Sequence, residues 1–182
     1  MKKNEYGKAL LYSYRYLETM CNAIDKYVKK KSINSLFYES CRPKSFMAFE
    51  VSDHIIKLIE RKRKLINTKV IIEDCLKELK PIQQRILLLT YLDNMSAESI
   101  QLCLKMTPRT FYRKKSEAIN SFCKKLAQKG YEENFIMIEL IGENWFNKFR
   151  LGSKHKENYG KFSDGFLSNL IRDLNRFDLV YC

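Results

Sequence analysis

The side chains best suited to binding chemistry gather between residues 107 and 115, where basic and hydroxyl groups are interspersed. They are Thr107, Arg109, Thr110, Tyr112, Arg113, Lys114 and Lys115. Arginine can donate two parallel hydrogen bonds to guanine O6 and N7. Hydroxyl groups bind phosphate without reading sequence, and lysines add an attraction that salt weakens. The pattern predicts that residues 108–115 enter the major groove of double-stranded DNA.

A second basic run consists of Arg61, Lys62, Arg63 and Lys64, in the middle of a long helical pattern. Such a run can contact the DNA backbone, or it can form a solvated side of a helix. The sequence leaves both readings of this run open.

Two short helices must position the first set of side chains. Ser96 is a suitable N-cap for a helix whose inward residues are Ile100, Cys103 and Leu104. After a brief turn, Thr107 is a suitable N-cap for the next helix and Pro108 suits its first position. Phe111, Ala118 and Phe122 then recur on one side, so the spacing predicts a helix-turn-helix whose second helix is basic.

Residues 76–126 resemble region 4 of sigma-70-family transcription factors and the related phage regulators of the ArpU type. The similarity lies in the runs LKELKPIQQRILLL at 76–89, MSAESI at 95–100 and MTPRTF at 106–111. The resemblance implies that Arg109, Tyr112, Arg113 and Lys114 contact bases or phosphates, and that RNA polymerase is a partner. The family usually has glycine where this chain has Lys105, so we expect a left-handed backbone or an altered turn there. A left-handed lysine costs about 1 kcal/mol relative to glycine. Gln101 replaces a small residue and predicts a looser or different crossing of the two helices.

The rest of the chain is also predicted to be helical, because only three prolines and six glycines interrupt 182 residues. Apolar spacing predicts helices over 5–29, 46–67, 68–79 and 81–92, with an irregular segment at 32–45. We expect an all-α bundle with three parts. These are an N-terminal scaffold or dimer-forming hairpin (1–75), the helix-turn-helix (76–130) and a small aromatic-rich helical extension that recruits a partner (131–182).

Charge is concentrated around the predicted DNA-binding helix. The chain carries a formal net charge of +13, and residues 96–130 hold eight Lys and Arg residues against Glu98 and Glu117. A chain this basic usually meets a polyanion, although a lysine-rich surface with no such partner is an alternative. No apolar run is long enough to span a bilayer and no signal peptide is evident, so we expect a cytoplasmic protein without a membrane partner.

Other reactive side chains have simpler interpretations. His54 and His155 lie far apart, and Glu132 and Glu133 suit a solvated helix start. The six cysteines form no Cys-x-x-Cys pair, and Cys103 and Cys123 are expected to be small core residues. We therefore expect no metal, no cofactor and no enzymatic activity.

The sequence as a whole predicts a bacterial or phage transcription regulator that binds specific DNA through its helix-turn-helix. Two alternatives remain open, a divergent sigma factor and a helical protein-interaction module that binds polymerase or another protein without reading DNA. RNA binding has only the basic charge in its favour. A homodimer is a further open question.

Overall fold

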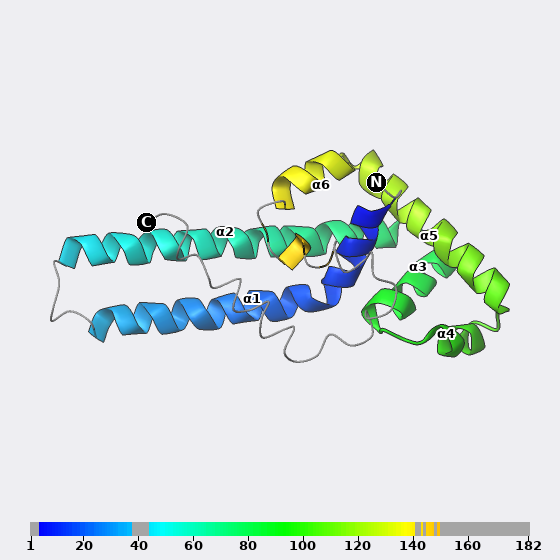
Figure 1. The fold of residues 1–182 in the computed structure, drawn as a ribbon, viewed down its shortest axis with the longest axis horizontal. Helices are drawn as coiled ribbons and strands as arrows, with labels where there is room; N and C mark the ends of the chain where they lie inside the picture. Colours follow the sequence, from blue (N-terminus) through cyan, green and yellow to red (C-terminus); the bar gives the residue numbers. More distant parts are fainter. Residues whose placement is uncertain (1–3, 38–43, 141–142, 144, 148, 150–182) are drawn as a thin grey trace. The chain divides into compact units, whose positions relative to one another are not determined.

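The computed structural model describes residues 4–37, 44–140, 143, 145–147 and 149, and these residues form helices and turns with no strand among them (Figure 1). The helices are α1 (Glu5–Phe37), α2 (Lys44–Lys77), α3 (Pro81–Leu87), η1 (Leu88–Leu92), α4 (Ala97–Cys103), α5 (Pro108–Gln128) and α6 (Glu133–Leu140). The expectation of an all-α fold is confirmed.

The described residues fall into two compact units. One unit holds residues 16–37 and 44–67, which we call the hairpin, and the other holds residues 4–15 and 68–149, which we call the motif unit. Both long helices, α1 and α2, contribute residues to each unit. The three-part division predicted at 75/76 and 130/131 stays a prediction, and residues 150–182 of the expected extension lie outside the described residues.

In the hairpin, α1 and α2 run antiparallel side by side (Figure 1). Its core consists of large aliphatic side chains that are almost fully buried, namely Leu17, Met20, Ile24, Leu58 and Leu65. Beside this core the Lys62 ammonium lies 2.7 Å from a carboxylate oxygen of Asp25, and the rings of Tyr27 and His54 are 5.7 Å apart. The hairpin is thus held by an apolar seam with polar contacts along it.

Both long helices run further than their sequence pattern predicts. The break expected between Asn67 and Thr68 is wrong, because α2 continues through it and Thr68 is a buried interior residue instead of a cap. The irregular segment expected from Ser32 is helical as far as Phe37. The physical reason is the same in both places: neither segment contains the proline or glycine that would end a helix.

The motif unit is built around the side of α5 that carries Phe111. Ile86 of α3, Ile100 of α4 and Phe111 form a buried cluster, and farther along α5 Phe122 and Leu126 are fully buried. Pro81 begins α3, as the sequence predicts, and the last turn before Asn94 widens into the π-helical segment η1. Asn94 then adopts a positive φ of 51° and turns the chain toward α4.

The start of α1 packs closely on α5 within the same unit. A Cβ atom at Gly7 would overlap the Sγ atom of Cys123, so only glycine allows this approach. The Tyr6 hydroxyl reaches the Cys123 carbonyl oxygen at 3.4 Å. Among the helices that the structure describes, none is both long and apolar enough to cross a bilayer.

Candidate nucleic-acid interface

The first helix of the motif begins at a well-formed cap. The Ser96 Oγ accepts a hydrogen bond from the Ser99 backbone N–H at 3.1 Å, which confirms the expected N-cap. Glu98 lies in the first turn of α4, where its own backbone N–H and the Ser96 side chain lower the pKa of its carboxyl group. A carboxylate at this position also interacts favourably with the positive end of the helix dipole.

The turn between the two helices has the geometry of a Schellman motif. The Met106 N–H donates to the Gln101 carbonyl at 2.9 Å and the Lys105 N–H donates to the Leu102 carbonyl at 3.2 Å. Lys105 adopts φ +50°, so the left-handed backbone expected at this position is confirmed. Leu104 and Met106 pack against the Ile86, Ile100 and Phe111 cluster, and this contact holds the turn against the strain of a left-handed lysine.

The second helix of the motif also begins where the sequence predicts. The Thr107 Oγ1 accepts a hydrogen bond from the Thr110 N–H at 3.4 Å, and its hydroxyl donates to the Thr110 hydroxyl at 2.9 Å. Pro108 occupies the first turn. The Thr107 hydroxyl thus uses its donor within the cap, whereas the Thr110 hydroxyl accepts that bond and keeps its own O–H to donate to a phosphate oxygen.

The outward face of α5 in its first two turns carries three of the predicted contact residues. Arg109, Tyr112 and Arg113 are exposed, and Tyr112 keeps 58% of its surface. The Arg113 guanidinium lies 3.9 Å from the Glu117 carboxylate, one turn later on the same face. That contact is long and solvated, so it holds the arginine only weakly. Thr110 and Lys114 are half-buried at the edge of this face.

Lys115 lies on a different side of α5 from the exposed arginines. Its ammonium nitrogen is 5.5 Å from the centre of the Tyr91 ring and 5.8 Å from that of Phe111. Burial lowers the pKa of Lys115, and the nearby charge of Lys8 lowers it further. The spacing could have indicated this position, because Lys115 follows the buried Phe111 by four residues and so shares its side of the helix.

The basic run in the hairpin does not form a single surface. Consecutive helical residues point about 100° apart, so Arg61 to Lys64 surround the helix. The Lys62 ammonium is held by Asp25, whereas Arg63 is exposed. Lys62 therefore does not lie on a fully solvated side of α2, which was one of the two interpretations that the sequence left open.

Two further lysines, Lys125 in the last turn of α5 and Lys129 directly after it, bind the carboxylate of Glu78, just after α2. The Lys129 ammonium lies 2.8 Å and the Lys125 ammonium 3.3 Å from its oxygens. Both contacts lower the pKa of the Glu78 carboxyl group. The contact with Glu78 raises the pKa of Lys129. The two lysines thus anchor the second half of α5. The sequence does not reveal this role, because the partners lie about 50 residues apart.

The outer surface of α4 differs from the expectation for one residue. Cys103 is exposed, so its predicted inward placement is wrong, whereas Cys123 is buried as expected and burial raises its pKa to about 12. The core takes Ile100 and Leu104, and a helix this short has no second inward position between them.

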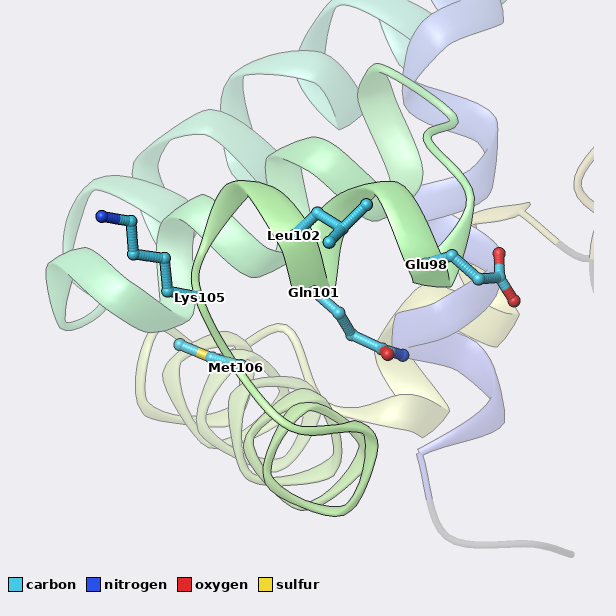
Figure 2. A pocket seen from close by; sticks show the side chains of 5 residues that line it. All are labelled: Glu98, Gln101, Leu102, Lys105 and Met106. Carbon is cyan, nitrogen blue, oxygen red and sulfur yellow. The ribbon is translucent and has the colours of Figure 1, made fainter.

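The exposed side of α4 borders an open hollow of about 450 Å³, beside which Leu102 keeps 80% of its surface exposed. Figure 2 shows the five residues that line it: Glu98, Gln101, Leu102, Lys105 and Met106.

Residues 50–122 match the model of a family described as a protein of unknown function, DUF1492. The matched segment runs from α2 to the second half of α5, so this family is similar to the chain over both the second hairpin helix and the helix-turn-helix. No curated protein and no solved structure matches the chain. Among the described residues, no group of three His, Cys, Asp or Glu side chains could hold a metal ion.

Proposed function

We propose that this chain is a DNA-binding transcription regulator that places the N-terminal half of α5 in the major groove of specific double-stranded sites. The observation that carries the proposal is the exposed face of Arg109, Tyr112 and Arg113 on a helix that is capped at its start and packed along its other side. A rigid helix with exposed arginines at its beginning is the arrangement by which helix-turn-helix proteins read base edges.

Each side chain has a role that follows from its position. Arg109 and Arg113 supply the paired donors that recognise guanine, and the Tyr112 hydroxyl and Lys114 contact flanking phosphates. The backbone N–H of Arg109, in the first turn of α5, adds a further phosphate contact beside Thr107. Lys115 acts differently from the sequence expectation, because its ammonium packs on Tyr91 and Phe111 and so supports the helix from within.

The partner and the biological setting rest on the resemblance to sigma region 4 and the ArpU-type regulators. On that basis we propose RNA polymerase as a partner and the cytoplasm of a bacterium, or of a phage-infected bacterium, as the site of action. A divergent sigma factor would use the same face of α5 on a promoter, and it would differ in also directing polymerase to initiate there.

The first experiment is a selection from random duplex DNA with the full-length protein, followed by affinity measurements on the enriched site. Arg113→Ala should weaken binding by about 1–3 kcal/mol and relax the preference at one base pair. Lys124→Ala is the matched control, because it removes one positive charge from an exposed position in the second half of α5. It should weaken binding to all sequences equally. If no sequence is enriched, or if both variants lose affinity uniformly, sequence-specific reading by α5 is wrong.

The salt dependence of the same binding tests how many phosphates are contacted. If the protein neutralises about 5 phosphates, the logarithm of the association constant should fall with the logarithm of salt concentration at a slope near −4.5. Arg113→Ala should leave the slope nearly unchanged if Arg113 contacts a base, whereas Lys114→Ala should make it shallower by about 1.

The hollow on α4 favours a second candidate function, a protein-interaction module. Leu102 is a large apolar side chain with 80% of its surface exposed, and it lies beside carboxylate, amide and ammonium groups that could bind a partner's polar atoms. Leu102→Glu should abolish binding to purified RNA polymerase in this case and leave the affinity for DNA unchanged. Polymerase binding that Leu102→Glu leaves intact would contradict the second candidate.

A further inference from the structure

Five large apolar side chains of α2 are exposed. Val70, with 49% of its surface exposed, lies in the motif unit, and the other four lie along one side of the hairpin. They are Phe49 with 74% of its surface exposed, Ile56 and Ile59 with 55% each, and Ile66 with 45%. We call them the α2 stripe. Their separations of seven, three and seven residues match the a and d positions of a heptad repeat, which keeps side chains on one seam of a helix.

The hairpin core does not account for the α2 stripe. On α2 that core uses Leu58 and Leu65, with His54 buried beside them, and these residues face α1. α2 therefore presents a second apolar side in addition to the one that packs within the hairpin. A seam of this kind is the surface that paired helices bury in a coiled coil.

We propose that the α2 stripe is a homodimer interface, in which α2 of a second copy lies antiparallel against α2 of the first. The stripe is symmetric about the midpoint between Lys57 and Leu58. Antiparallel pairing therefore places Phe49 against Ile66 of the second copy and Ile56 against Ile59 of the second copy. The same interaction occurs twice, as a two-fold axis requires. This proposal depends on α2 alone and is independent of DNA binding.

Charge selects the antiparallel direction. In a parallel dimer Arg63 would lie in the seam directly against Arg63 of the second copy, where two like charges repel. The antiparallel arrangement places Arg63 against Ser52 of the second copy and next to Asp53. Glu60 comes to the edge of the seam near Asp53 of the second copy, where the two carboxylates repel each other. The ion pair between Asp53 and Lys57, at 2.7 Å, offsets this repulsion.

The exposed apolar area of the α2 stripe is sufficient for a homodimer of moderate affinity. Side chains of this size bury roughly 150–200 Å² each when fully covered, so the exposed parts of the stripe amount to roughly 400 Å² per copy. Two copies contribute about 800 Å², half of a standard interface of about 1,600 Å². The aliphatic stems of the flanking lysines and arginines supply further area. We expect a dimer with a dissociation constant on the order of micromolar.

The test is analytical ultracentrifugation of the full-length chain from about 1 to 100 µM, a range that brackets micromolar affinity. The wild type should be a dimer at the upper end. Ile59→Glu should weaken the dimer by about 100-fold or more, because it places a carboxylate in an apolar seam twice. Ile138→Glu is the matched control, since Ile138 on α6 is 75% exposed and lies outside the stripe. Circular dichroism should show unchanged helicity in both variants.

The double variant Ile56→Lys with Ile59→Glu tests the direction of pairing. In the antiparallel arrangement each new lysine faces a new glutamate of the second copy, so dimerisation should be restored. In a parallel arrangement like charges would face each other and the variant would stay monomeric, which would overturn the antiparallel register. A monomeric wild type at 100 µM, or a dimer that Ile59→Glu leaves intact, would overturn the interface itself.

Discussion

The helix-turn-helix and the hairpin define their helices by different means. The ends of α4 and α5 are set by local interactions: Ser96 and Thr107 cap their first turns, and Lys105 in a left-handed conformation ends α4. The hairpin segments of α1 and α2 run on without internal breaks, and the apolar contact between them stabilises the pair. Local polar groups can thus set the ends of short helices, whereas the length of a long helix depends on the absence of breakers and on packing.

The largest expected effect is on the core of the motif unit. Phe111→Ala should lower the free energy of unfolding by about 3–5 kcal/mol, because Phe111 is fully buried against Ile86 and Ile100. Tyr112→Ala, at the neighbouring exposed position, should lower it by less than about 1 kcal/mol. Urea denaturation followed by circular dichroism measures both. Equal losses would mean that local caps, and not this core, hold the two short helices together.

The next effect tests the continuity of α2. Asn67→Pro should lower the free energy of unfolding by about 3 kcal/mol or more, because proline removes a backbone hydrogen bond and clashes with the carbonyl four residues earlier. Asn67→Ala is the control and should be neutral or slightly stabilising, since Asn67 is exposed within the helix. If proline were tolerated at this position, the helix would have the break that its sequence pattern suggested.

Two helix ends in the motif unit allow a direct comparison of lysine with glycine. α4 ends at Lys105 with φ +50° and α5 ends at Gly130 with φ +83°, and both ends have the same pair of backbone hydrogen bonds. Lys105→Gly should raise the free energy of unfolding by about 1 kcal/mol and Gly130→Ala should lower it by about 1 kcal/mol. Thermal unfolding of both variants measures the difference. A loss of stability in Lys105→Gly would show that contacts of the lysine outweigh its backbone strain.

The smallest effect concerns the ion pairs that anchor α5. The pKa of Glu78 lies below its ordinary value of 4.5 in the folded chain, because Lys129 and Lys125 bind the carboxylate. These contacts therefore stabilise the fold at pH values above 4.5, and the contribution is lost as the pH falls through the folded-state pKa. Glu78→Gln should lower the melting temperature slightly at pH 7 and not at pH values well below the folded-state pKa. A difference that does not change with pH would assign the effect to packing.

Much of the candidate interface could be predicted from local sequence. The cap at Ser96, the start of α5 at Thr107 and Pro108, and the left-handed Lys105 all depend on residues within one turn of each other, so their physical chemistry is readable in the chain. The exposure of Arg109 and Arg113 followed from the buried spacing of Phe111, Ala118 and Phe122. The inward placement of Cys103 failed because the pattern could not show how few positions so short a helix buries.

By itself the sequence determined the all-α class, the caps of the two motif helices and the concentration of positive charge around α5, since these depend on residue type and near neighbours. Only the tertiary structure decided which charges remain available. It placed Lys115 on two aromatic rings, Lys125 and Lys129 on Glu78, and Lys62 on Asp25. The last three pair with residues dozens of positions away, and packing alone brings together groups so distant along the chain.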